Sequence, residues 1–208
     1  MQISIFQDES IHSYLIRVLS CQGKLLRPSD LYGLVSLSGV VNAAPKLDSE
    51  HGKLLSSYSS TFIEKLLCEH TPLNSMHSSE LIEAKDYVLF GKRPLREELI
   101  PNGRTQLRYC RKCFAEQTFE HGVSWFRLDW LFSIRCVLHQ EVLSHVFSHS
   151  TSCCSASMNI LDSVLSATSG RCRKCGGDFW KHEKSLYINP DYRQNYLLIK
   201  QIYRPALL

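Results

Sequence analysis

The sequence predicts a mainly α-helical chain in which small metal-binding modules follow an N-terminal helical part. Two observations carry this prediction. Apolar residues recur at helical spacing in the first half, and seven of the nine cysteines lie between Cys110 and Cys175. We therefore expect three parts: a helical domain with its linker over residues 1–105, tandem zinc-finger or zinc-ribbon modules over 106–185, and a C-terminal helix over 186–208.

Composition limits the class of protein. The chain has 208 residues, of which 44% are apolar and 21% are charged, as in folded domains and unlike disordered or collagen-like chains. It has no apolar run of the ~18–20 residues that cross a bilayer, and Met1–Ser10 lacks the basic start of a signal peptide. An odd number of cysteines without such a signal predicts reduced thiols, a cytoplasmic location and no membrane contact.

Four helices are expected in the first half. The first follows the capping residues Asp8–Ser10, has apolar residues at helical spacing from Ile11 to Leu19, and ends at Gly23. The others are expected at Arg27–Leu37, Ser60–Glu69 and Ser79–Tyr87. We expect a loop over 42–58 and a linker at Gly91–Gly103.

These short helices fit a helix-turn-helix unit or a generic helical packing domain, and the spacing leaves both open. Cys21 and Cys68 are expected to be small buried apolar residues rather than ligands. Asp191–Tyr203, with its regularly spaced apolar and aromatic residues, predicts the C-terminal helix.

The strongest motif is a pair of two-ligand knuckles. Cys110-x2-Cys113 is followed after 22 residues by Cys136-x2-His139. Four sulfur and imidazole donors in two close pairs suit a tetrahedral structural Zn²⁺ site. The alternative is two unrelated pairs within a core.

A third knuckle, Cys172-x2-Cys175, predicts a second Zn²⁺ ion, with Gly176 permitting the tight turn. Its remaining ligands must come from His145, His149, Cys153 or Cys154. Cys153 or Cys154 comes first, because adjacent cysteines rarely both bind one ion, and His149 is the fourth ligand.

Basic and aromatic residues surround these motifs. Residues 106–208 carry 13 Lys and Arg against 8 Asp and Glu, whereas residues 1–105 carry 11 against 12. The basic pairs Arg111-Lys112 and Arg173-Lys174 stand at the knuckle tips, where they either contact nucleic-acid phosphates or lie in solvent near a thiolate centre. Trp125, Phe126 and Trp130 are expected to form a core rather than to stack on bases.

Catalysis is not expected. His139-Gln140-Glu141 with Cys172-x2-Cys175 matches the H-x-E…C-x-x-C pattern of zinc deaminases, but the proline before the second pair is replaced by Arg171. His139 is better explained as a ligand beside three cysteines. A four-ligand site leaves zinc no open position for substrate.

The motif order resembles the TniQ/TnsD family of bacterial transposition target-selection proteins. The resemblance rests on the start, Asp8-Glu9-Ser10-Ile11-His12-Ser13-Tyr14-Leu15-Ile16-Arg17, and on the later knuckles with a tryptophan-containing stretch between the first two. It covers about residues 8 to 180. It implies that Cys110, Cys113, Cys136 and His139 form a first zinc site, and that Cys172 and Cys175 form half of a second.

The resemblance also implies a non-enzymatic adaptor. Such proteins link target recognition, by a DNA attachment site or a CRISPR RNA-guided complex, to an AAA+ ATPase that regulates a transposase. The chain departs from the family in the adjacent Cys153-Cys154 pair and in its short C-terminal part, which favours an adaptor that borrows target choice from another complex. The alternative is a free-standing sequence-specific DNA-binding protein. The sequence leaves open whether the chain acts as a monomer or a homodimer.

Overall fold

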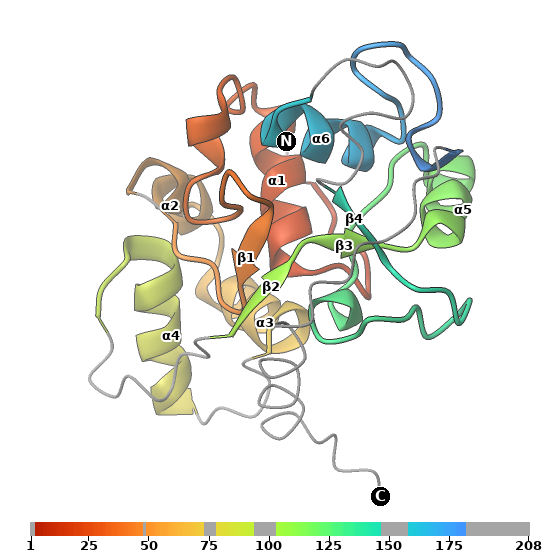
Figure 1. The fold of residues 1–208 in the computed structure, drawn as a ribbon. Helices are drawn as coiled ribbons and strands as arrows, with labels where there is room; N and C mark the ends of the chain where they lie inside the picture. Colours follow the sequence, from red (N-terminus) through yellow and green to blue (C-terminus); the bar gives the residue numbers. More distant parts are fainter. Residues whose placement is uncertain (1–2, 48, 73–77, 94–102, 147–157, 182–208) are drawn as a thin grey trace, which may run out of the picture.

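The computed structural model describes residues 3–47, 49–72, 78–93, 103–146 and 158–181. Over these residues the fold is mixed helical with few strands (Figure 1). The helices are α1 Ile11–Cys21, α2 Ser49–Ser56, α3 Ser60–His70, α4 Ser78–Phe90, α5 Arg111–His121 and α6 Ile160–Ser169. The strands are β1 Val40–Asn42, β2 Arg104–Gln106, β3 Arg108–Tyr109 and β4 Ser144–His145, and short 3-10 turns occur at Pro28–Leu31, Asp129–Leu131 and Phe179–Lys181.

Three of the expected helices are confirmed. α1 begins after Ser10, whose side-chain oxygen accepts a hydrogen bond from the Ser13 amide, and the chain turns away at Gly23, where φ is +67°. α3 is capped in the same way by Ser59. α4 extends three residues beyond the expected Tyr87.

Two expectations for the first half are wrong. The helix expected over 27–37 is only the turn Pro28–Leu31, because Gly33 has a φ of +84° that an α-helix cannot include. The loop expected over 42–58 contains α2. Gly52 lowers its intrinsic helix propensity, but the missing side chain lets the helix approach α4: a Cβ there would lie 1.8 Å from the Leu89 carbonyl oxygen. Tertiary packing against α4 therefore determines that this segment is helical.

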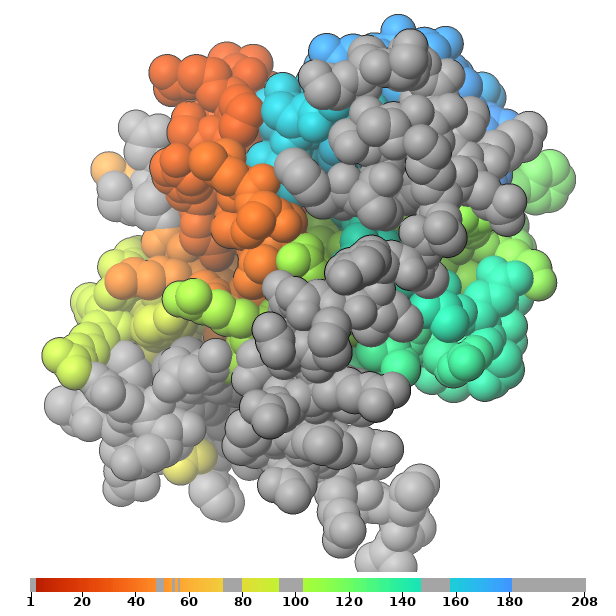
Figure 2. All heavy atoms as spheres, viewed as in Figure 1, coloured from red at the N-terminus to blue at the C-terminus, as the bar shows by residue number. Residues whose placement is uncertain are grey.

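The strands form two small antiparallel sheets, of which the first joins the first half of the chain to the start of the second and the other lies within the second half. β1 pairs with β2, placing Val41 opposite Thr105, and β3 pairs with β4, placing Tyr109 opposite Ser144. Figure 1 shows α1 near the centre, α2 and α4 at one side and α5 at the other, with the strands between them. Figure 2 shows orange atoms of the first half against green atoms of the second near the middle of the same face.

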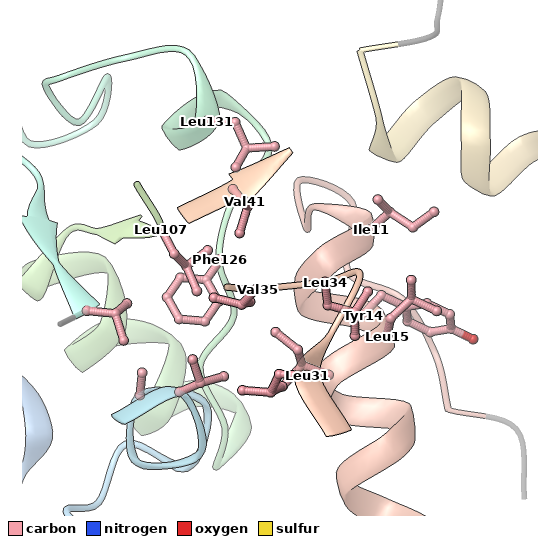
Figure 3. Close-up of a cluster of buried hydrophobic side chains, with 14 of the residues drawn as sticks. Ile11, Tyr14, Leu15, Leu31, Leu34, Val35, Val41, Leu107, Phe126 and Leu131 are labelled. Carbon is pink, nitrogen blue, oxygen red and sulfur yellow. The ribbon is translucent and has the colours of Figure 1, made fainter. Parts of the chain in front are cut away.

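The buried apolar residues form one core that includes both halves. In Figure 3, Leu31, Leu34 and Val41 from the first half lie near Leu107 and Phe126 from the second. All five are buried. The boundary expected near residue 105 therefore divides the sequence motifs and not this core. The expected linker is described only at its two ends, and the C-terminal helix expected at 191–203 lies outside the described residues.

The cysteines of the first half differ from expectation. Cys21 is exposed at the end of α1, so its expected burial is wrong. Cys68 is half-buried in α3. Neither belongs to the cluster of potential metal ligands described below.

The start of the chain is fastened to the segment that follows α5. The Ser10 amide donates to the Phe126 carbonyl at 2.8 Å, and the Phe126 amide donates to Ser13 Oγ at 3.0 Å. The Asp8 carbonyl accepts from the Leu128 amide at 2.9 Å, and the Asp8 carboxylate accepts from Trp125 Nε1 at 2.7 Å. Polar residues of the start motif thus hold α1 against the second half of the chain.

A buried ion pair completes this attachment. Glu9 is fully buried, and its carboxylate accepts from Arg17 Nε at 2.8 Å and from Arg17 Nη2 at 2.5 Å. The Arg17 guanidinium lies 4.7 Å from the centre of the Phe6 ring, which stacks on Trp125 at 3.8 Å. Removal of Glu9 or Arg17 would leave the charge of the other residue unpaired in a site with little access to water.

Arg17→Met tests the pair. We expect a loss of about 3–5 kcal/mol in the free energy of unfolding, because Glu9 stays buried without its partner. Lys65→Met is the matched control, since Lys65 pairs with Glu69 at 3.8 Å on an exposed face of α3, and should cost at most about 1 kcal/mol. Urea titration measures both. Equal losses in the two variants would show that the Glu9–Arg17 pair is not specially stabilising.

His12 is a buried neutral group on α1. It is fully buried, and neither ring nitrogen has a hydrogen bond of ordinary geometry among the described residues. Burial lowers the pKa of His12 to about 4, and the nearby backbone of Asn42 offsets only part of this effect. The unfolded chain therefore binds more protons than the folded chain between about pH 6.5 and pH 4.

The free energy of unfolding should consequently fall as the pH falls through this window. At pH 5 this preference of the unfolded chain for the proton lowers the free energy of unfolding by about 2 kcal/mol relative to pH 7. In His12→Leu this effect is absent. From pH 7 to pH 5, the free energy of unfolding of the wild type should therefore fall by about 2 kcal/mol more than that of His12→Leu. Parallel pH profiles would contradict the neutral buried state of His12.

Candidate metal centre

Four side chains from two distant segments meet in one cluster. Cys110, Cys113, Cys136 and His139 place one potential ligand atom each within 4.8 Å of one another. The three cysteines are buried, and His139 is half-buried. The expected first ligand set is therefore brought together in full, and the cluster could hold one metal ion.

The start of α5 supplies the first pair. Cys110 follows β3 and occupies the N-cap of α5 with an extended backbone, and its carbonyl accepts from the Phe114 amide at 3.0 Å. Cys113 lies in the first helical turn. Residues at the N-cap and three positions later project to the same side of a helix start, where the helix dipole favours thiolate. The two-residue spacing therefore directs both sulfurs to one point.

A tight turn supplies the second pair. The Cys136 amide donates to the Glu141 carbonyl and the Gln140 amide donates to the Cys136 carbonyl, both at 2.8 Å. Gln140 has a φ of +57° and is the described non-glycine residue with a positive φ. This turn brings Cys136 and His139 to the same side.

The spacing of the ligand atoms suits a tetrahedral ion. His139 Nδ1 lies 3.4 Å from Cys110 Sγ, 3.3 Å from Cys113 Sγ and 3.7 Å from Cys136 Sγ. The sulfurs of Cys113 and Cys136 are 3.5 Å apart. Around a Zn²⁺ ion with Zn–S bonds of about 2.3 Å, tetrahedral geometry places two sulfurs about 3.8 Å apart. The four donors are thus near the positions that such an ion requires.

The thiols of the cluster differ in acidity. Hydrogen bonding from Cys113 is the main cause that lowers the pKa of Cys110 to about 5, and it outweighs burial. The same contact with Cys110 raises the pKa of Cys113. The contact between these two cysteines thus favours a thiolate within the pair, and the thiolate is the form that binds metal. Binding a metal ion would displace the remaining thiol protons.

Charged residues surround the cluster. The Lys112 ammonium lies 2.8 Å from the Glu141 carboxylate, which joins the two knuckles and raises the pKa of Lys112. On the outer side of the imidazole, His139 Nε2 lies 3.0 Å from Glu116 Oε1. Burial acts to lower the pKa of His139, but hydrogen bonds with Cys110 and Glu116 raise it.

The Cys172–Cys175 knuckle has the same backbone hydrogen bonds as the Cys136 turn. The Cys172 amide donates to the Gly177 carbonyl and the Gly176 amide donates to the Cys172 carbonyl, both at 2.8 Å. Gly176 has a φ of +72° at the position that corresponds to Gln140. An antiparallel bridge closes each turn, Arg135 with Val142 and Arg171 with Asp178.

The other expected ligands of a second site are not placed. His149, Cys153 and Cys154 lie outside the described residues. His145 lies in β4, where burial first and the Arg108 charge second lower its pKa to about 4. His145 is not part of a ligand cluster among the described residues.

The basic residues at the second knuckle also have acidic neighbours. Arg173 Nε lies 4.0 Å and Lys174 Nζ 3.5 Å from the Asp162 carboxylate, and both basic side chains are about half exposed. Arg111 is half-buried at the start of α5. Contact of these residues with nucleic acid stays a prediction.

The aromatic segment between the first two knuckles belongs to the core, as expected. Trp125, Phe126 and Trp130 are all buried. Phe126 and Trp130 both lie against Phe114 of α5, with ring centres 5.4 and 5.6 Å apart. These rings hold the first knuckle in place and are not available to stack on bases.

The ligands required by a zinc deaminase are not assembled around His139. The cluster joins His139 to Cys110, Cys113 and Cys136, and not to Cys172 and Cys175. Glu141, the general acid/base in that comparison, is paired with Lys112.

No family model matches the chain, and no curated protein matches it. Among the described residues, no helix is long and apolar enough to cross a membrane.

Glu116 belongs to the site although no ligand motif in the sequence marks it. The signal was present, because Cys110 at a helix start places residue 116 two turns along the same helix. Since side chains lean toward the helix N-terminus, a glutamate at this position reaches back toward the metal cluster. The missing step was to recognise that α5 begins at the first knuckle.

Cys110→Ser tests the cluster. A serine hydroxyl is a poor metal ligand, so the variant should lose about one bound metal ion per chain relative to the wild type. Because the cluster holds two distant segments together, the variant should also lose cooperative unfolding of the second half. Elemental analysis and thermal denaturation measure these effects, with Cys21→Ser as the exposed control. Unchanged metal content would show that the ligands are misassigned.

Proposed function

We propose that the cluster binds a structural Zn²⁺ ion. Three sulfurs and one imidazole nitrogen are the donors that zinc prefers, and their spacing is close to tetrahedral. Four protein ligands leave no position for a substrate or a water nucleophile, unlike the three-ligand sites of zinc enzymes. The metal would hold the start of α5 to the Cys136 turn.

We further propose a second Zn²⁺ ion at Cys172 and Cys175. The support is the repeated backbone of the Cys136 turn, including the positive φ after the second ligand. The remaining ligands proposed from the sequence are His149 and either Cys153 or Cys154. A metal content of two ions per chain, falling to one in Cys172→Ser, would support this site.

For the whole chain we propose a non-enzymatic adaptor that selects targets for DNA transposition. It would connect a target-recognition complex, RNA-guided or bound to an attachment site, to an AAA+ ATPase. The single observation that supports this proposal is the attachment of the start motif to the segment between the first two knuckles, through Asp8, Ser10 and Ser13. The two features that resemble TniQ/TnsD proteins therefore form one structural unit, as expected if they serve one common function.

Co-purification tests this proposal. The tagged chain, expressed together with the products of its neighbouring genes, should retain an AAA+ ATPase and target-recognition components, whereas Cys110→Ser should not. Lys65→Met, altered on an exposed face, is the control and should retain them as the wild type does. Recovery of the folded, zinc-loaded chain without either partner would overturn the adaptor proposal.

The alternative function is sequence-specific DNA binding by the isolated chain. A duplex selection experiment distinguishes it, because an adaptor should select no sequence. Arg173→Glu with Lys174→Glu separates weak phosphate contact from base recognition. Arg173 and Lys174 share the Asp162 carboxylate at 4.0 and 3.5 Å, whereas Lys112 pairs more closely with Glu141, at 2.8 Å. A nonspecific phosphate contact would lose affinity uniformly across sequences and would show a smaller salt dependence.

A further inference from the structure

A carboxylate outside the ligand set contacts the only histidine of the cluster. Glu116 Oε1 lies 3.0 Å from His139 Nε2, on the side of the imidazole opposite the cysteines. The other ring nitrogen, Nδ1, is the one that lies 3.3–3.7 Å from the three sulfurs. The two nitrogens of His139 therefore have separate partners.

This arrangement determines where the proton of the neutral ring resides. A nitrogen that binds a metal must offer a lone pair, so the proton must be on the other nitrogen. A carboxylate accepts hydrogen bonds and cannot donate one when ionised. Glu116 therefore favours the tautomer with the proton on Nε2 and the lone pair of Nδ1 directed at the cysteines.

The helix brings Glu116 to this position. Residue 116 is three positions after Cys113, so both lie on the same face of α5. Because helical side chains lean toward the N-terminus, Glu116 reaches back to the turn that carries Cys113. The ligand and the carboxylate thus come from one rigid element, while His139 comes from another.

We propose that Glu116 is a positioning residue of the metal centre: it orients His139 and holds the imidazole in the tautomer that binds metal through Nδ1. This inference rests on the proposed zinc site. Outer carboxylates of this kind commonly raise metal affinity and ligand basicity. Glu116 also links α5 to the Cys136 turn, in addition to the Lys112–Glu141 pair.

The test compares Glu116→Ala, Glu116→Gln and Glu120→Ala. Glu120 is the matched control, since it lies one turn further along α5, is exposed and contacts His121 rather than a ligand. We expect Glu116→Ala to bind Zn²⁺ about tenfold more weakly in competition with a chromogenic chelator, and Glu120→Ala to be within twofold of the wild type. Glu116→Gln retains an acceptor without the charge and should restore part of the loss.

A second measurement separates positioning from a general effect on stability. In the zinc-loaded wild type, the ¹⁵N NMR spectrum should show a protonated Nε2 of His139 with slow exchange against water, assigned by its loss in His139→Cys. In Glu116→Ala this proton should exchange faster. At one free Zn²⁺ concentration, the free energy of unfolding of Glu116→Ala should lie below that of Glu120→Ala only by the amount that its tenfold weaker zinc binding accounts for, about 1.4 kcal/mol.

The outcomes are distinct. If Glu116→Ala retains wild-type zinc affinity and a protected Nε2 proton while Cys110→Ser loses its zinc, the positioning role is wrong and the metal centre stands. If Cys110→Ser also retains its zinc, the metal centre itself is wrong and the inference fails with it. If Glu116→Ala does not fold, the same comparison is made with Glu116→Gln, for which wild-type affinity and exchange would overturn the proposal.

Discussion

The meeting of two cysteine knuckles is the constraint on which the second half of the fold depends. The first pair lies at the end of β3 and the second lies before β4, and β3 and β4 are hydrogen-bonded to each other. The Arg108 side chain also donates to the Ser133 carbonyl at 2.8 Å, close to the second knuckle. Strand pairing therefore aligns the two segments, and the ligand cluster joins them next to the paired strands. A metal ion would reinforce an arrangement that short strands alone stabilise weakly.

The first half of the chain is attached to this unit through polar contacts that are unusually buried. Glu9, Ser10, His12 and Ser13 are fully buried at the start of α1. Buried polar groups add little net stability, but they penalise any arrangement in which their partners are missing. Apolar packing against the shared core thus supplies the driving force, while the Glu9–Arg17 pair and the bonds to Phe126 determine how α1 lies on the second half.

The sequence predicted those features that depend on local patterns. Periodic apolar residues identified α1, α3 and α4, and ligand spacing identified the complete four-residue cluster. It did not predict α2, whose Gly52 opposes a helix until α4 packs against it, or the effect of Gly33, whose positive φ interrupts an otherwise apolar helical pattern. Glu116 was missed for a related reason, because its role depends on a partner 23 residues away. Long-range contacts decide the cases of α2 and Glu116, whereas Gly33 acts through its own backbone conformation.

Several basic residues of the described second half lie beside acidic partners. Its excess of basic residues would suit nucleic acid if those residues were free. Arg127 is paired with Asp8 and Asp129, Arg171 with Asp178, and Lys112 with Glu141. A zinc ion with three thiolates and a neutral imidazole would carry one net negative charge, so Lys112 also offsets the centre beside it. These neighbouring carboxylates reduce the positive charge that the paired residues would offer to a phosphate backbone.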